Sequence, residues 1–260
     1  MKMATGVPQE KATQLLELYG NMLLEGMSID EFSYRRGVRE LENQSSNSSI
    51  SALGFLHALY GNTHEAITTF EAFDMMSNST LATNYCFMLR HTGCVNLLNS
   101  KIYAFADAHR SKTLSCTAYS MAYRFGDRER LIHYMDMHIK LLSEDENRAG
   151  AEKHKLELLS EVDGAYSLSG CTSEQFHILA SIIWGLTEKH RLITGYVEVS
   201  KKRSPCYVVD VPDKDADFIA TLNWELAQEI CNVDALDDCG LVARFSPSRE
   251  LHSGISYASE

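Results

Sequence analysis

The chain has 260 residues, of which 45% are hydrophobic and 23% charged, and these shares are typical of a folded protein with its own apolar core. Fifteen glycines and four prolines are too few for a fibrous or proline-rich low-complexity protein. The formal charge of −11 is uneven, because residues 1–150 carry 14 basic and 17 acidic side chains whereas residues 151–260 carry 10 and 18. The acidic second part favours a basic partner.

The cysteines and the first residues indicate a reducing compartment. The seven cysteines are odd in number and form no CxxC pair, which argues against a disulfide framework or a zinc knuckle. The first residues, MKMATGVPQE, lack the apolar stretch of a secretory signal, and no run of about 18 apolar residues occurs that could span a bilayer. We therefore expect a cytoplasmic protein without membrane contact.

The apolar residues of the segment 11–162 recur with helical spacing, and the residues that favour helices are common there. Four glycines, Gly26, Gly61, Gly93 and Gly126, each end an apolar segment, and the spacings between them are 35, 32 and 33 residues. A period of this length predicts stacked helix–turn–helix units. Each glycine is expected to end a helix in the left-handed conformation.

The second unit, SISALGFLHALYGNTHEAITTFEAFDMM, carries the most detailed pattern. A Leu-Gly pair at Leu53–Gly54 precedes the turn glycine Gly61, and the small Ala66 and the aromatic Phe70 follow it. This order resembles the tetratricopeptide repeat, in which small residues let two antiparallel helices approach closely. The third and fourth units keep the turn glycine and part of the pattern, so the resemblance covers about residues 12–142. A generic array of helical hairpins is the simpler alternative.

Two domains are predicted on either side of a linker. The helical array occupies residues 8–162, and the segment Asp163–Gly170, DGAYSLSG, reads as the linker. A compact domain follows at residues 171–250. The fold class is therefore α+β, with an all-α tetratricopeptide-like array followed by a small α+β domain.

Helical and strand periods alternate in the second domain. They predict the order α-β-β-α-β and a mostly antiparallel sheet. The helices are expected at Phe176–Leu186 and Phe218–Ile230, and the strands at Ile193–Ser200, Cys206–Val211 and Leu241–Phe245.

No motif points to catalysis. The chain lacks a phosphate loop, a dinucleotide fingerprint, an HExxH pair and a nucleophile elbow. We expect no catalytic residue, no metal and no cofactor. The alternative of an enzyme stays open, with its pocket near residues 163–170.

The resemblance to tetratricopeptide repeats implies a partner-binding face, because the first helix of each unit in that family lines a surface that holds peptides or helices. Guanidinium groups bind carboxylates through paired hydrogen bonds, and aromatic rings bury apolar side chains. The implied ligand is therefore a protein segment with a carboxylate beside an apolar anchor. Alternatively, these side chains cover a neighbouring helix or face solvent. The residues implied are Phe55, Phe87, Arg90, His91, Ser120, Tyr123 and Arg124.

Two basic clusters support a competing hypothesis. One contains Arg35, Arg36 and Arg39 on a helix, and the other contains Lys201, Lys202 and Arg203 at the tip of the expected hairpin. Either cluster could contact phosphate, which would suit a DNA-binding transcriptional regulator acting as a homo-oligomer. The arginines could equally pair with nearby glutamates.

The favoured function is non-enzymatic protein–protein interaction, as an adaptor, chaperone or neutralising partner. The array would hold a segment of another protein. The acidic C-terminal domain would contact a basic partner or pair with a second copy, through a sheet edge or through the apolar helix Phe176–Leu186.

Overall fold

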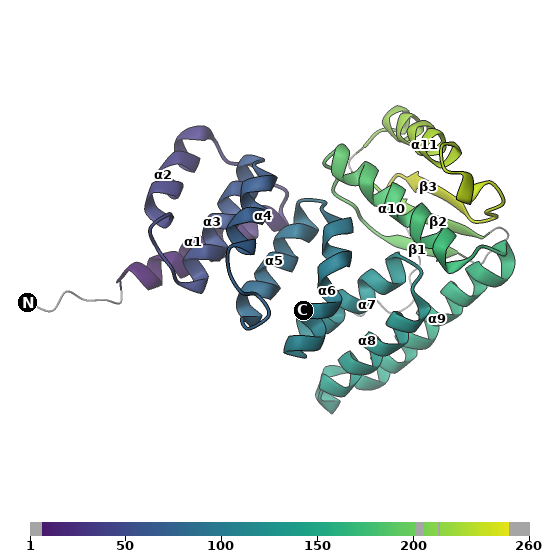
Figure 1. The fold of residues 1–260 in the computed structure, drawn as a ribbon, viewed down its shortest axis with the longest axis horizontal. Helices are drawn as coiled ribbons and strands as arrows, with labels where there is room; N and C mark the ends of the chain where they lie inside the picture. The colour runs from purple at the N-terminus through teal and green to yellow at the C-terminus, as the bar shows by residue number, and fades with distance from the viewer. Residues whose placement is uncertain (1–6, 201–204, 213, 250–260) are drawn as a thin grey trace, which may run out of the picture. The chain divides into compact units, whose positions relative to one another are not determined.

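The computed structural model describes residues 7–200, 205–212 and 214–249 (Figure 1). Within these ranges it contains eleven α-helices and three β-strands. Internal packing divides the chain into two compact units, Met1–His109 and Arg110–Glu260. The described part of the first unit is helical, and the second unit carries the sheet.

The first unit consists of three successive helix pairs. Helix α3 lies at its centre and packs against α1, α2, α4 and α5. This arrangement confirms an array of packed helices, because α3 packs against α4, α4 against α5 and α5 against α6, whereas α1 packs mainly against α3 rather than against α2. The pairs are α1 (Val7–Leu24) with α2 (Glu31–Leu41), α3 (Asn47–Tyr60) with α4 (Thr63–Glu71), and α5 (Ser79–His91) with α6 (Val95–His109).

The four periodic glycines end their helices as predicted. Their φ angles are 66° at Gly26, 89° at Gly61, 79° at Gly93 and 68° at Gly126, all in the left-handed region. After each glycine, the next backbone N–H donates to the carbonyl oxygen five residues back, which closes the helix end. These four bonds join Met27 to Met22, Asn62 to His57, Cys94 to Leu89 and Asp127 to Ala122.

Gly54 shows why the second pair needs a small residue inside its first helix. A Cβ atom added to Gly54 would lie 2.4 Å from Cε2 of Phe70, a contact that real Cβ atoms do not make. Phe70 is fully buried. Helices α3 and α4 therefore pack at this distance only because residue 54 has no side chain.

The second unit contains a helical part followed by a three-stranded sheet with further helices. The order from α10 to β3 is the predicted α-β-β-α-β order. The elements are α7 (Lys112–Arg124), α8 (Arg128–Leu141), α9 (Arg148–Ser169), α10 (Ser173–Lys189), β1 (Val197–Ser200), β2 (Cys206–Asp210), α11 (Ala216–Cys231) and β3 (Val242–Ser246), with short 3-10 helices at Glu144–Glu146 and Asp234–Leu236.

The segment expected as a linker is helical. Residues 163–169 form the last turns of α9, which ends at Gly170 with a φ of 66°. Ala165 is fully buried, and the Tyr166 hydroxyl donates to the Gly126 carbonyl oxygen at 2.5 Å. The helices α7 to α9, which the sequence assigned to the array, thus lie in the same compact unit as the sheet.

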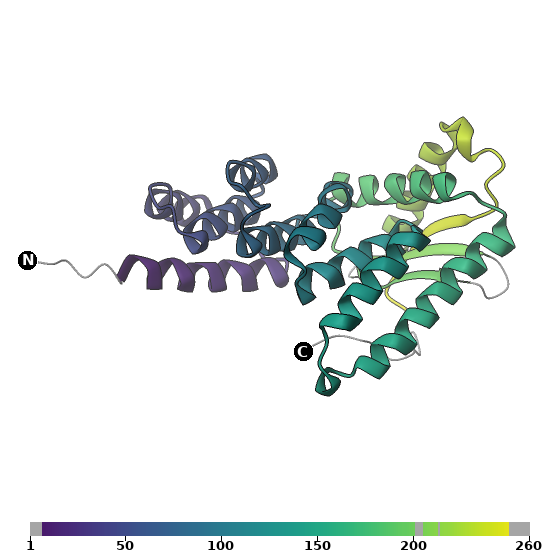
Figure 2. The same cartoon turned by 60° about the horizontal axis from the view of Figure 1, so that its bottom comes forward.

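The sheet has the strand order β1-β2-β3. Strands β1 and β2 are antiparallel, with Val197 opposite Val209, whereas β2 and β3 are parallel, with Cys206 opposite Val242. The expectation of a mostly antiparallel sheet is wrong, because α11 returns the chain to the end of the sheet where β2 begins. Figure 2 shows the sheet between α9 and α10.

Candidate binding surfaces

Phe55 and Phe87 belong to a row of aromatic rings that begins inside the first unit. The ring centroids are 6.2 Å apart between Phe70 and Phe55, 5.4 Å between Phe55 and Phe87, and 4.3 Å between Phe87 and His91. Only 3% of Phe55 is exposed, and α1 covers it at Gly20, where an added Cβ would lie 3.6 Å from the ring. Phe55 therefore supports the half-buried Phe87 and does not itself face a partner.

Arg90 and His91 lie at the end of α5, beside Phe87. Arg90 is exposed, and no described carboxylate lies within ion-pair distance of its guanidinium group. Burial, and then the charge of Arg90, lower the pKa of His91 to about 4, so this ring is neutral at pH 7. We call Phe87, Arg90 and His91 the α5 surface; its positive charge comes from Arg90 alone.

Tyr123 was expected on the partner-binding face, but the structure places it in the interior of the second unit. Its side chain is 7% exposed. Its hydroxyl donates to Glu161 Oε2 at 2.5 Å and accepts from the backbone N–H of Val199 at 3.0 Å. Burial, and then the nearby Glu161, raise the pKa of Tyr123 well above its ordinary value, so the hydroxyl stays protonated.

Arg124 also joins α7 to the rest of the second unit. Its guanidinium carbon lies 4.9 Å from the ring centroid of Trp184 on α10, and its backbone carbonyl accepts from the Tyr207 hydroxyl at 2.8 Å. Trp184 Nε1 donates to the same hydroxyl at 3.0 Å. Ser120 is half-buried on the same helix. The turn glycines could not predict this placement, because the sheet that packs on α7 is distant in sequence.

The basic cluster of α2 lies on the surface of the first unit. Arg35, Arg36 and Arg39 are exposed, and Arg35 pairs with Glu31 at 2.6 Å. No described carboxylate lies within ion-pair distance of Arg36 or Arg39. The other expected basic cluster, Lys201, Lys202 and Arg203, lies outside the described residues.

The apolar face of α10 was expected as one contact with a second copy, and the structure turns it inward. Phe176, Leu179, Ile183 and Leu186 are all buried. The ring centroid of Phe176 lies 5.4 Å from that of Tyr207 on β2. This face therefore covers the sheet of its own chain and is not open to a partner.

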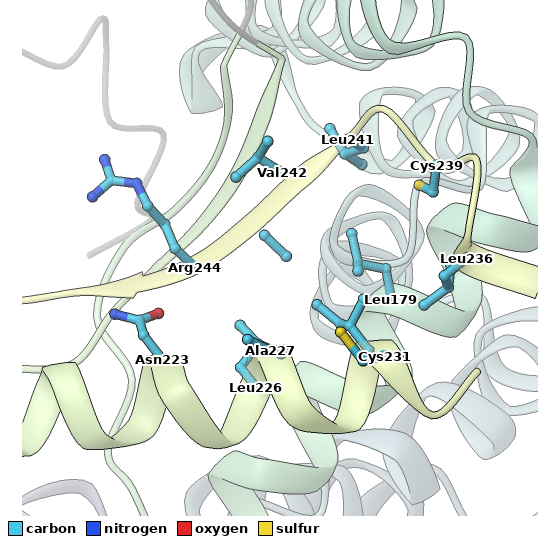
Figure 3. A pocket seen from close by; sticks show the side chains of 12 residues that line it. Leu179, Asn223, Leu226, Ala227, Cys231, Leu236, Cys239, Leu241, Val242 and Arg244 are labelled. Carbon is cyan, nitrogen blue, oxygen red and sulfur yellow. The ribbon is translucent and has the colours of Figure 1, made fainter. Parts of the chain in front are cut away.

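A hollow of about 410 Å³ lies between α11 and β3 (Figure 3). Most of its lining is apolar and comes from three parts of the second unit: Leu226, Ala227 and Ile230 of α11, Leu179 of α10, and Leu241 and Ala243 of the β3 segment. Its size is in the range of ligand-binding pockets. The sequence predicts both elements but not the hollow, because the hollow depends on how closely α11 and β3 approach each other.

Strand β3 lies at an edge of the sheet, and its hydrogen bonds show which residues face outward. The Val242 N–H donates to the Pro205 carbonyl at 3.1 Å, and the Ser246 carbonyl accepts from the Val211 N–H at 2.8 Å. Both bonds run to the β2 side. Since backbone groups alternate in direction along a strand, those of Ala243 and Phe245 point away from β2.

The Asn223 side chain hydrogen-bonds to the outward backbone groups of Phe245, one of these two residues. Asn223 of α11 donates from Nδ2 to the Phe245 carbonyl at 3.0 Å, and its Oδ1 accepts from the Phe245 N–H at 2.8 Å. Within the described residues, no group hydrogen-bonds to the outward N–H and C=O of Ala243. The edge of β3 is thus closed at Phe245 and open at Ala243.

The described ranges contain no group of three or more His, Cys, Asp or Glu side chains placed to hold a metal ion. In the same ranges, no helix is both long enough and apolar enough to cross a membrane. Comparison with protein-family models, with curated proteins and with solved structures finds no match to this chain.

Proposed function

We propose that this chain is a non-catalytic protein-binding module, an adaptor, chaperone or neutralising partner, that holds a segment of another protein against its helical array. The turn glycines, spaced 32 to 35 residues apart and closed by the same hydrogen bond, support an array similar to tetratricopeptide repeats. The observation that carries the proposal is Arg90, an exposed guanidinium with no described carboxylate partner, set beside Phe87.

The α5 surface suits a segment with a carboxylate next to an apolar side chain. Arg90 would bind the carboxylate through two parallel hydrogen bonds, and the exposed part of Phe87 would contact the apolar side chain. His91 is neutral at pH 7 and extends the aromatic surface without adding charge. The buried Phe55 holds Phe87 in place before the partner arrives, which reduces the entropy lost on binding.

The proposed surface is smaller than the seven-residue face that the sequence implied. Phe55 and Tyr123 are buried, and Arg124 is stacked on Trp184. These three residues are therefore proposed to support structure, and the half-buried Ser120 of α7 is left out of the surface. Phe87, Arg90 and His91 are proposed to contact the partner.

Affinity purification of the full chain, followed by binding measurements with the main captured protein, tests this proposal. Arg90→Glu should weaken binding by about tenfold or more, since it replaces attraction of the carboxylate by repulsion. Phe87→Ala should weaken it as well. Arg39→Glu makes the same charge change at an exposed arginine of α2 and should have little effect. Unchanged binding by both α5 variants would exclude this surface.

Nucleic-acid contact through α2 is the alternative, and the exposure of Arg36 and Arg39 favours it. Two acidic residues on the same helix, Glu31 and Glu40, reduce the net positive charge there. A gel-shift measurement with duplex DNA at low salt decides this alternative, because phosphate contacts weaken steeply as salt rises. A shift that Arg39→Glu removes would support it, and the absence of any shift at low salt would exclude it.

A further inference from the structure

We propose that the second unit carries a separate peptide site, in which an extended segment of a partner protein pairs with the outer edge of β3 and inserts an apolar side chain into the hollow beside α11. The segment also carries an acidic residue that meets Arg244. This site lies on other elements than the α5 surface and does not depend on it.

The outward backbone N–H and C=O of Ala243 are available to pair with an added strand. An edge strand presents N–H and C=O groups that can pair with an added strand, and many peptide-binding proteins use this mode. Asn223 already occupies the groups of Phe245. An added segment must therefore begin opposite Arg244 and run toward Leu241, which limits the pairing to a few residues.

The hollow determines which side chain the segment carries opposite Ala243. Leu241, Val242, Ala243 and Arg244 all line the hollow. Because side chains alternate between the two faces of a sheet, the Ala243 side chain lies on the opposite face from those of Val242 and Arg244. A residue paired with Ala243 therefore directs its side chain toward Leu226, Ala227 and Ile230 of α11. This environment accepts an aliphatic or aromatic side chain.

The neighbouring positions determine the rest of the pattern. Figure 3 shows the side chains of Val242 and Arg244 on the side of β3 away from α11. Val242 is 56% exposed, so an apolar residue opposite it buries apolar surface. Arg244 is exposed and has no described carboxylate within ion-pair distance, so it favours an acidic residue opposite it.

Residues 151–260 are acidic overall, with 10 basic and 18 acidic side chains, but the local charge at Arg244 favours a segment with a carboxylate over a second copy of β3. The strand itself reads VARFS and contains no acidic residue, so a second β3 would bring another arginine and no carboxylate. Arg249, which follows β3, binds Asp210 Oδ1 at 2.7 Å and Glu198 Oε2 at 2.5 Å. These acceptors belong to β2 and β1, so Arg249 lies on the side of β3 away from its outer edge.

A short designed peptide tests the site directly on the full chain. The probe is acetyl-Thr-Glu-Leu-Val-Thr-Ser-amide with a fluorescent label, whose Glu, Leu and Val would pair with Arg244, Ala243 and Val242 in the antiparallel direction. Fluorescence polarisation should show saturable binding. Methylation of the leucine nitrogen, or replacement of the glutamate by lysine, should weaken binding by about tenfold. If no probe with Leu, Val or Phe at the central position binds, the proposal is wrong.

Three variants locate the peptide on β3. Ala243→Pro removes the outward N–H but no bond to β2, and should weaken binding by about tenfold. Ala227→Trp fills the hollow from an exposed position of α11 and should also weaken binding by about tenfold. It replaces Ala243→Pro as the test if the proline variant does not fold. Arg244→Glu should reverse the preference between the glutamate and lysine probes, while Lys140→Glu, on the exposed side of α8, should not. An unchanged preference in Arg244→Glu overturns the proposal.

The remaining outcomes concern other occupants. If the probe binds only after residues 250–260 are deleted, the chain's own segment occupies the edge and the proposal is wrong. If mass in solution shows a dimer that Ala243→Pro converts to a monomer, a second copy occupies it and the proposal is also wrong. Arg90→Glu should leave probe binding unchanged, so failure of this site and failure of the α5 surface can be distinguished.

Discussion

In each compact unit a buried tyrosine hydroxyl forms hydrogen bonds, but the partners lie at different distances along the chain. In the first unit, the Tyr85 hydroxyl donates to Glu71, an exposed residue 14 positions earlier in the chain, at 3.0 Å. In the second unit, the Tyr123 hydroxyl bonds to Glu161 and to the backbone of Val199, which are 38 and 76 positions away. The first unit therefore forms from neighbouring helices, whereas the second requires distant segments to meet at one polar group.

The largest expected change in the free energy of unfolding is at Gly126, where the turn after α7 contacts α10. A Cβ atom there would lie 2.5 Å from Cγ of Phe176, which is fully buried, and the φ of +68° strains any L-residue. Gly126→Ala should lower the free energy of unfolding by about 3 kcal/mol, as the sum of backbone strain and overpacking. Denaturant unfolding of the full chain measures this change.

Gly170→Ala is the matched control for this variant. Gly170 has nearly the same φ, +66°, but nothing lies within 4 Å of the added Cβ. The substitution should cost only the backbone strain, about 1 kcal/mol. An equal loss of unfolding free energy at the two glycines would show that contact with Phe176 adds nothing to the cost of Gly126→Ala.

Tyr123→Phe tests the long-range polar contact. It leaves Glu161 and the Val199 N–H without the hydroxyl, so we expect a loss of about 2 kcal/mol. Hydrogen exchange at the Val199 amide should also become faster. Tyr85→Phe should cost less than 1 kcal/mol, because the exposed Glu71 can bind water instead. If the two variants are equally destabilising, the contrast between the units is wrong.

Gly54→Ala tests how closely the helices of the first unit pack. The added Cβ clashes with Phe70, so the free energy of unfolding should fall by about 1 kcal/mol, even though alanine favours helix. Gly20→Ala on α1 places its Cβ 3.6 Å from Phe55, an ordinary contact, and should stabilise the unit by about 0.5 kcal/mol. If the two variants change the free energy of unfolding in opposite directions, packing and not helix propensity determines the stability at these positions.

The smallest expected effect is a change in the titration of His91. Its folded pKa of about 4 lies below the ordinary value of 6.5, so the unfolded chain takes up the proton first. The stability from this group is present above pH 6.5 and is lost as the pH falls toward 4. Arg90→Ala removes the smaller of the two causes, so the pKa of His91 should rise but remain below 6.5. Nuclear magnetic resonance titration of the ring measures this, and an unchanged pKa would exclude a role for Arg90.

Local patterns predicted the elements, and non-local contacts explain the errors. The turn glycines and the order of strands follow from residues close in sequence, and both are confirmed. The Gly and Ser content of residues 163–169 predicts a linker, whereas the segment is helical and Tyr166 hydrogen-bonds to Gly126, 40 residues earlier. The local pattern predicts Tyr123 on the surface, because it contains no sign of the contact with Val199, 76 residues away.

The paired hydrogen bonds of Asn223 have a consequence for self-assembly. Its side-chain amide imitates a peptide group, so any chain that extends the sheet along β3 must stop at Phe245. An edge strand that can pair over only a few residues is a poor template for cross-β stacking. The Asn223 amide thus limits how far another strand can pair along β3, and it leaves the backbone groups of Ala243 accessible.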